Sequence, residues 1–128
     1  MKRSFLKSKI HRAVITQTEL HYEGSLTIDK KIMEEADVLE LEKVSVVNIN
    51  NGERFETYVI PGERGSGTIC LNGAAARKAI VGDKVIIMTF CDLDETEISN
   101  FEPKIILLDE DNKIKSVLNK IEVNNKIN

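Results

Sequence analysis

The sequence lacks the features that mark membrane and exported proteins. No run of apolar residues approaches the ~18 that a bilayer-spanning helix needs. The basic N-terminus, residues 1–7, is not followed by the apolar core of a signal peptide. We therefore expect a cytoplasmic protein that does not enter a membrane.

Histidine and cysteine are also scarce. The chain has two histidines, His11 and His21, without a third ligand nearby, and two cysteines, Cys70 and Cys91, in no metal-binding spacing. In a reducing compartment we expect both thiols to be buried as small hydrophobic groups. The glycine-rich stretch 62–67 is not followed by the Gly-Lys-Ser/Thr of a phosphate-binding loop. The sequence therefore predicts no metal site and no such loop.

The chain has little excess charge of either sign. Its 18 basic and 21 acidic residues give a net charge of −3, which argues against a general nucleic-acid-binding protein. Its 128 residues, 41% of them hydrophobic and 30% charged, are typical of a soluble globular domain that buries a core unaided. We expect a single domain spanning residues 1–128.

The pattern of β-branched residues and turns predicts a mostly-β fold. We expect strands at 3–16, 22–28, 43–49, 53–60, 68–71, 84–90 and 104–108, and a strand or short helix at 114–123. A short helix at 30–36 should begin after the N-cap Asp29 and should bury a face with Ile32, Met33, Ala36 and Leu39. Residues 72–78 should form a loop into a short helix with free N–H groups, 92–100 a helical turn, and 124–128 a frayed tail. Many short strands between frequent turns, such as that at 50–52, indicate a small barrel.

The Gly24-Ser25 pair is the clearest candidate for chemistry. A serine hydroxyl beside a peptide carbonyl can attack it and convert the amide to an ester, and a glycine tolerates the bend that this attack requires. Most Gly-Ser pairs are only flexible turns, however. Polar residues in or next to the strands are equally ordinary one by one, because a lone Lys or Arg usually faces solvent and a Tyr usually packs in the core.

Several longer motifs occur together in one register. They are Lys9-Ile10-His11-Arg12, Tyr22-Glu23-Gly24-Ser25, 51–58, 63–66, Asn72-Gly73-Ala74-Ala75-Ala76 and 81–83. Over residues 1–123 the chain closely resembles the bacterial aspartate 1-decarboxylases. The resemblance implies a double-psi β-barrel with short helices, and a homotetramer with active sites between subunits.

The resemblance also implies an activity. An inactive proenzyme would cut itself between Gly24 and Ser25 into 1–24 and 25–128, and Ser25 would become a covalent pyruvoyl group. This carboxy-lyase would need no metal and no pyridoxal phosphate. A Schiff base between L-aspartate and the pyruvoyl group would lose CO2 and release β-alanine for pantothenate, and hence coenzyme A, biosynthesis.

Individual roles follow from the same resemblance. In processing, Ser25 would be the nucleophile and Thr57 would polarise the Gly24 carbonyl, with support from Tyr22, His11 and Asn72. In turnover, Tyr58 would donate the proton, and the substrate would be bound by Lys9, Arg54, Thr57 and the backbone of Gly73, Ala74 and Ala75. Val47 stands where many relatives have a tryptophan, which leaves one wall of the pocket open to question.

Other interpretations remain open at this point. The chain could be a double-psi barrel that only binds a partner, or a pyruvoyl enzyme for another amino acid such as glutamate. Processing could be spontaneous or could need a maturation factor. Neighbouring strand residues point to opposite faces, so Thr57 and Tyr58 enter one pocket only if the strand is bulged. We favour the alternative that they serve different sites in adjoining subunits.

Overall fold

The computed structural model describes residues 1–120, which form one nine-stranded sheet and three short helices. The strands are β1 (Arg3–Val14), β2 (Gln17–Glu19), β3 (Ser25–Asp29), β4 (Lys43–Asn48), β5 (Arg54–Gly62), β6 (Ile69–Asn72), β7 (Lys84–Leu93), β8 (Lys104–Leu108) and β9 (Ile114–Leu118). The helices are α1 (Lys30–Ala36), the 3-10 helix η1 (Gly73–Lys78) and α2 (Glu95–Ile98). None of the helices in residues 1–120 has the length and apolar character needed to cross a membrane.

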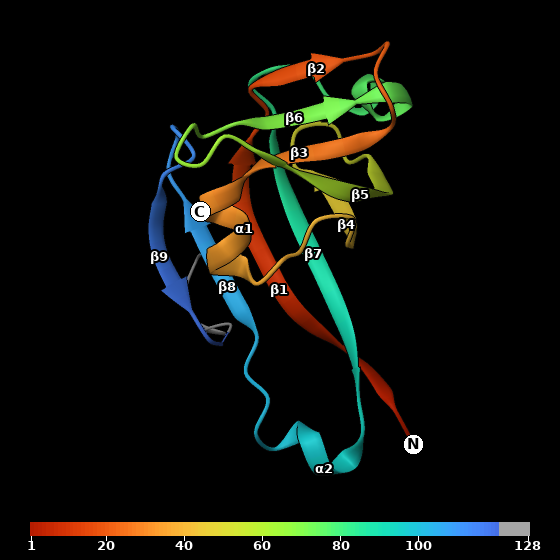
Figure 1. Cartoon of the computed structure of the whole chain (residues 1–128), viewed down its shortest axis with the longest axis vertical. Helices are drawn as coiled ribbons and strands as arrows, with labels where there is room; N and C mark the ends of the chain where they lie inside the picture. The colour runs from red at the N-terminus through yellow and green to blue at the C-terminus, as the bar shows by residue number, and fades with distance from the viewer. Residues whose placement is uncertain (121–128) are drawn as a thin grey trace.

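The strand order brings together strands that are far apart in the sequence. It is β2-β6-β3-β5-β4-β7-β1-β8-β9, with parallel pairs β2–β6, β3–β5 and β1–β8 between strands that are distant in sequence. Such pairs require crossing connections. In Figure 1, β1 and β7 run side by side along the long axis, while β2, β6, β3 and β5 lie across one end.

Inward-facing residues from across the sheet meet in one hydrophobic core. Ile10, Ile87, Val46 and Phe55 are level with one another on β1, β7, β4 and β5, and all four belong to or pack against one cluster. That cluster also takes residues from β3, β6, β8 and α1, so the sheet wraps around it. The predicted fold class, a mostly-β double-psi barrel with short helices, is confirmed in its β content, its short helices and its curled sheet with crossing connections.

Helix α1 spans Lys30–Ala36, as predicted, but its buried face does not include Leu39. Asp29 caps it as expected, because its carboxylate accepts the Lys31 N–H at 2.8 Å. Asp37 then adopts the left-handed conformation, with φ of 56°, and stops the helix after Ala36. The prediction that Leu39 belongs to the buried face was therefore wrong, since Leu39 lies beyond the helix and is 70% exposed.

Loop 63–67 is held by two buried polar side chains. The Asp29 carboxylate accepts the N–H groups of Gly65 and Gly67, both at 2.8 Å. The Asn112 amide donates to the carbonyls of Gly67 and Val14, both at 2.8 Å. The amides of Gly65 and Gly67 are thus already occupied within the protein, which agrees with the rejection of a phosphate-binding loop.

Other boundaries differ slightly from the predictions. The strand expected at 22–28 begins at Ser25, so Gly24 lies outside it, and the strand expected to end at Ile60 continues to Gly62. The ambiguous segment from 114 is a strand to Leu118, and its last residues, 121–123, lie outside the described residues, as does the predicted frayed tail. The strand expected at 3–16 ends at Val14, and its pairing with β7 has two register shifts, one of them around Arg12, whose φ is 64°.

Candidate active site

Ser25, the first residue of β3, is almost completely buried. Its hydroxyl donates to the Glu23 carbonyl at 3.1 Å and accepts a hydrogen bond from the Asn72 side-chain amide at 3.0 Å. Asn72 is in position because β3 and β6 pair in an antiparallel register that sets Ser25 opposite Asn72. The hydroxyl therefore reaches back along its own chain past the Gly24–Ser25 peptide bond.

The Asn72 side chain forms three contacts. Its NH2 group donates to the hydroxyls of Ser25 and Thr27, the latter at 2.9 Å. Its carbonyl oxygen accepts the Cys70 thiol at 3.3 Å. The pairing of β3 with β6 explains this cluster. Ser25 is opposite Asn72, and Thr27 is opposite Cys70. Residues two apart in a strand point to the same face, so all four side chains lie together.

Cys70 keeps its proton in this environment. Burial raises the pKa of the Cys70 thiol, and the negative charge of Glu19 raises it further. Neither Cys70 nor Thr27 was named as a site residue from the sequence. The signal that could have found them is the two-residue spacing from Asn72 and from Ser25 in adjacent strands.

Gly73 lies against the segment before Ser25. Its φ is 71°, and a Cβ placed on it would lie 2.6 Å from the Gly24 Cα and 2.9 Å from the Tyr22 carbonyl oxygen. A side chain at position 73 would therefore displace the backbone of residues 22–24. Ala74 is exposed and Ala75 is half-buried in η1. These small residues follow Asn72 at the end of β6, where Asn72 pairs with Ser25.

The backbone conformation at position 24 does not require a glycine. Its φ lies outside the left-handed region, and a Cβ added there would meet no atom within 4 Å. We expected a glycine here because it tolerates the bend that the attack requires; in this conformation other residues could also adopt the backbone of position 24. The close approach that does demand a glycine is on the other side of the contact, at Gly73.

Thr57 and Tyr58 lie on β5, next to the part of that strand that pairs with β3. The parallel register begins with Leu26 beside Val59, so Thr57 and Tyr58 directly precede the paired stretch. The pairing of β5 with β4 has no register shift, so there is no bulge at these residues. The two side chains therefore point to opposite faces of the sheet.

Lys9 and Arg54 lie on the outer face of the sheet. Lys9 is level with Met88, Ser45 and Glu56, and Arg54 is level with Val47, so their side chains point away from the core. Their strands are three spacings apart, roughly 14 Å. Within residues 1–120 no acidic side chain forms an ion pair with either cation. Arg54 and Val47 also line a shallow groove of about 280 Å³.

The remaining predicted residues are placed as follows. His11 is buried on β1, level with Leu107 of β8. Tyr22 has a largely exposed ring, 59% accessible, and approaches the site through its backbone carbonyl. The structure thus brings together Ser25, Asn72, Gly24, Gly73 and the Tyr22 backbone, while Lys9, Arg54 and His11 lie on other strands.

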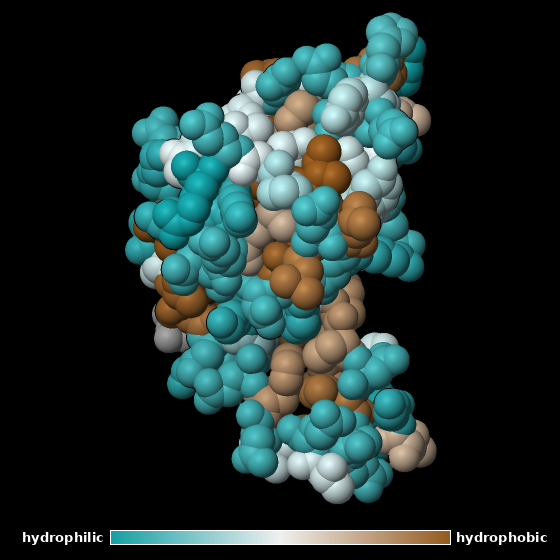
Figure 2. Space-filling view, in the orientation of Figure 1, coloured by the Kyte–Doolittle hydropathy of each residue, from teal (hydrophilic) through white to brown (hydrophobic). Residues whose placement is uncertain are grey.

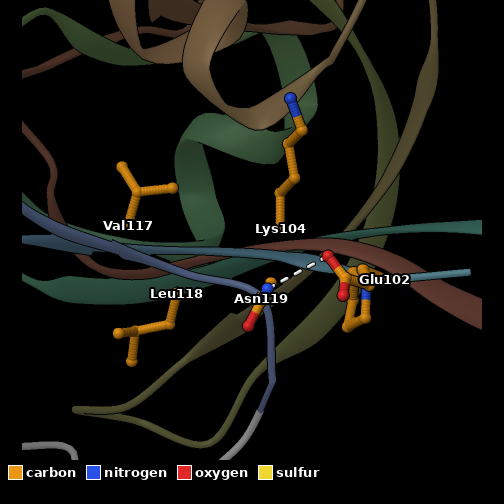
Figure 3. Close-up of a pocket in the computed structure, with 6 residues that line it drawn as sticks. Glu102, Lys104, Val117, Leu118 and Asn119 are labelled. Carbon is orange, nitrogen blue, oxygen red and sulfur yellow. Dashed lines mark hydrogen bonds between the residues drawn. The ribbon is translucent and has the colours of Figure 1, made fainter.

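Two grooves lie away from this cluster. One, of about 340 Å³, is lined by Lys104, Val117 and Leu118 and closed at one side by the hydrogen bond from Asn119 to Glu102, at 3.0 Å (Figure 3). The other, of about 520 Å³, lies beside α2 with Phe5 and Phe101 in its wall, and Figure 2 shows apolar surface at the narrow part of the molecule. Neither contains a predicted site residue. No set of three potential metal ligands is found among the residues that the structure describes.

Comparisons with known proteins identify the family of the chain. The family model for aspartate decarboxylase matches residues 1–115. Aspartate 1-decarboxylase of Caldicellulosiruptor saccharolyticus is 65% identical over 117 residues, which are 91% of each chain. The Thermoanaerobacter pseudethanolicus protein of the same name is 59% identical over 113 residues, 88% of this chain and 97% of its own.

A solved structure, that of the rationally designed protein mkDPBB_sym_86, is similar over 60% of this chain and 90% of its own, at 17% identity and a TM-score of 0.46, which is too weak to bear on the fold. The sequence relationships are much stronger, since they extend over nearly the whole chain. The chain therefore belongs to the aspartate decarboxylase family.

Proposed function

We propose that this chain is a self-processing decarboxylase that converts L-aspartate to β-alanine and CO2 for pantothenate, and hence coenzyme A, biosynthesis. Family membership supports the decarboxylation of aspartate over a module that only binds a partner. The structural observation that supports self-processing best is the buried Ser25 hydroxyl, which the Asn72 amide contacts at 3.0 Å beside Gly24.

Processing begins at the Gly24–Ser25 peptide bond. The Ser25 Oγ bonds to the Gly24 carbonyl carbon, the C–N bond breaks, and the hydroxyl proton passes to the released amine, which leaves an ester. Loss of the Ser25 Cα proton and breakage of the Cβ–Oγ bond then release the Gly24 carboxylate. Water enters and ammonia leaves at the new end of residues 25–128. Thr57, two residues before the Val59 that pairs with Leu26, would stabilise the oxyanion in the first step.

The residues around Ser25 fit a small carbonyl group at this position. Position 25 is enclosed, Asn72 and Thr27 offer hydrogen-bonding groups, and Gly73 leaves room for the backbone of residues 22–24. When present, the pyruvoyl group supplies an electrophilic carbonyl that condenses with the substrate amine and accepts the electrons released with CO2. No metal and no pyridoxal phosphate is needed for that chemistry.

The outer face provides the groups for substrate binding. Arg54 would hold a carboxylate of aspartate with its planar fork, and Lys9 would supply a second positive charge. Tyr58, on the same side of β5 as Arg54, would deliver a proton from its hydroxyl to the substrate carbon. Backbone groups of Gly73, Ala74 and Ala75 would bind the rest of the substrate, and Thr57 would contact it after processing.

The opposite directions of Thr57 and Tyr58 support a site shared between subunits. A homotetramer, in which the outer face of one chain covers the Ser25 cluster of the next, would bring Lys9 and Arg54 to the pyruvoyl group. His11 and Tyr22 would position the new chain ends. The enzyme would act in the cytoplasm, with or without a maturation factor. Lys9 and Arg54 could also bind glutamate, which has two carboxylates as well. Decarboxylation of glutamate is therefore the alternative activity to test.

Mass spectrometry of the purified chain and of Ser25→Ala tests the proposal. The parent should yield residues 1–24 and residues 25–128, the larger fragment lacking one ammonia relative to simple hydrolysis, with an N-terminus that resists Edman degradation. Ser25→Ala should remain one chain and should not release CO2 from L-aspartate. Cleavage of the Ala variant at the same bond would show that Ser25 is not the nucleophile. A processed enzyme that turns over glutamate faster than aspartate would show that the proposed substrate is wrong.

A further inference from the structure

We propose that Cys70 is a positioning residue for self-processing, and that its thiol orients the Asn72 amide toward Ser25. The inference rests on the proposed self-processing and extends it to a side chain that does not touch the reacting atoms. Its basis is the contact from the Cys70 Sγ to the Asn72 Oδ1 at 3.3 Å, next to the Asn72 contact with Ser25 at 3.0 Å.

The Asn72 amide needs a partner that distinguishes its two ends. Its neighbours on the other side are the hydroxyls of Ser25 and Thr27, and a hydroxyl can either donate or accept. Ser25 accepts from Asn72 while its own proton is donated to the Glu23 carbonyl. That contact must break when the hydroxyl turns to attack Gly24, and Ser25 then no longer selects the amide orientation.

The Cys70 thiol favours one orientation of the Asn72 amide both before and during the attack. A protonated thiol is a weak donor and a weak acceptor. Here it donates to the amide oxygen at 3.3 Å, and because oxygen is a better acceptor than sulfur, this contact favours the orientation with the NH2 end toward Ser25 and Thr27. Burial raises the pKa of Cys70, which keeps the proton on sulfur at neutral pH. With Cys70 in place, Asn72 presents a donor to the region of the scissile bond. Without it, the amide can turn and present its oxygen, which cannot stabilise a developing negative charge.

The test compares rates of self-cleavage in full-length variants by pulse-chase and denaturing gel electrophoresis. Cys70→Ser keeps a donor, Cys70→Val keeps the approximate volume without a donor, and Cys70→Ala removes both. We expect Cys70→Val and Cys70→Ala to cleave roughly three- to ten-fold more slowly than the parent, the effect of losing one neutral hydrogen bond. Cys70→Ser should restore most of the rate, and Cys91→Val, on β7, is the matched control.

The pattern distinguishes orientation from packing. If Cys70 only fills space, Cys70→Val will cleave at the parental rate and Cys70→Ala will be slow, which overturns the inference. Equal rates in all three variants overturn it as well, and in both cases self-processing itself stands. A parent chain that never cleaves overturns the proposed function together with this inference. Thermal unfolding of each variant in the Ser25→Ala background, where cleavage is blocked, checks that slow variants are folded.

Discussion

At the scale of single residues, Asn72 has the most constrained position in the candidate site. It is 2% exposed, and its amide contacts three side chains, those of Ser25, Thr27 and Cys70. Buried polar groups are stable only when they are hydrogen-bonded, so each partner restricts the others. The side chains around the Ser25 hydroxyl therefore hold one another in place, as the proposed attack on a neighbouring carbonyl would require.

Tyr58 allows the proton-donor role to be separated from processing. Tyr58→Phe keeps the ring but removes the hydroxyl on the side of β5 that also carries Arg54. We expect this variant to self-cleave normally and to turn over L-aspartate about 10²–10⁴-fold more slowly, the usual contribution of a general acid. The measurement is kcat for CO2 release, with the cleaved fraction determined by gel.

The control for Tyr58 is retention of substrate binding. Borohydride should still link the substrate to the processed variant, because the loss concerns a later step. Normal turnover by a fully processed Phe variant would mean that water or another group protonates the substrate carbon. A variant that fails to cleave would instead assign Tyr58 to processing.

At the scale of elements, Asp29 joins α1 to loop 63–67. It accepts the N–H groups of Lys31, Gly65 and Gly67. Burial alone raises the pKa of Asp29, but these three hydrogen bonds together with the charge of Lys113 hold it below its ordinary value. Because the folded-state pKa is lower, the stabilisation is complete above the ordinary value near 4. It is lost as the pH falls through the folded-state pKa.

Asp29→Asn tests this connection. The amide can still accept from Lys31 and Gly65, but its NH2 group would face the Gly67 N–H, so one buried donor loses its acceptor. We expect a loss of roughly 1–3 kcal/mol in the free energy of unfolding at pH 7, measured by urea denaturation. The difference from the parent should narrow as the pH falls below 4. A constant difference down to pH 2 would show that the charge of Asp29 is not involved.

The sequence predicted elements better than it predicted contacts. Local signals are sufficient for the helix after Asp29, the turn with Gly52 and most strand ranges, because caps, glycines and β-branched residues act within a few positions. The contact of Gly73 with Gly24 and the partners of Asn72 depend on register between β3 and β6. Register joins residues far apart in sequence, and no local pattern encodes it. The roles of the site residues came from the family resemblance, not from spacing.

At the scale of the whole molecule, the position of Arg54 makes the shared site testable. Co-expression of Ser25→Ala with Arg54→Ala gives mixed oligomers in which one chain carries the processed end and another carries the arginine. If the sites lie between subunits, mixed oligomers should decarboxylate L-aspartate well above the level of either variant alone. The measurement is CO2 release by oligomers purified through two different tags.

A site contained within one chain gives the opposite result. No chain in the mixture has both the processed Ser25 and Arg54, so activity would stay at the level of Arg54→Ala alone. A mixture of Ser25→Ala with the double variant Ser25→Ala/Arg54→Ala is the matched control, because it has no processed end. Activity in that control would indicate contamination.

The place of β1 in the sheet has a consequence for how the protein folds. β1 lies between β7 and β8, so cleavage after Gly24 would leave an interior strand on a separate polypeptide. Folding of the precursor is unimolecular, whereas the processed protein could refold only by a second-order encounter of two fragments. Its folded fraction would then depend on concentration. The precursor must therefore fold before it is cut, and an enzyme that loses its small fragment cannot readily be repaired.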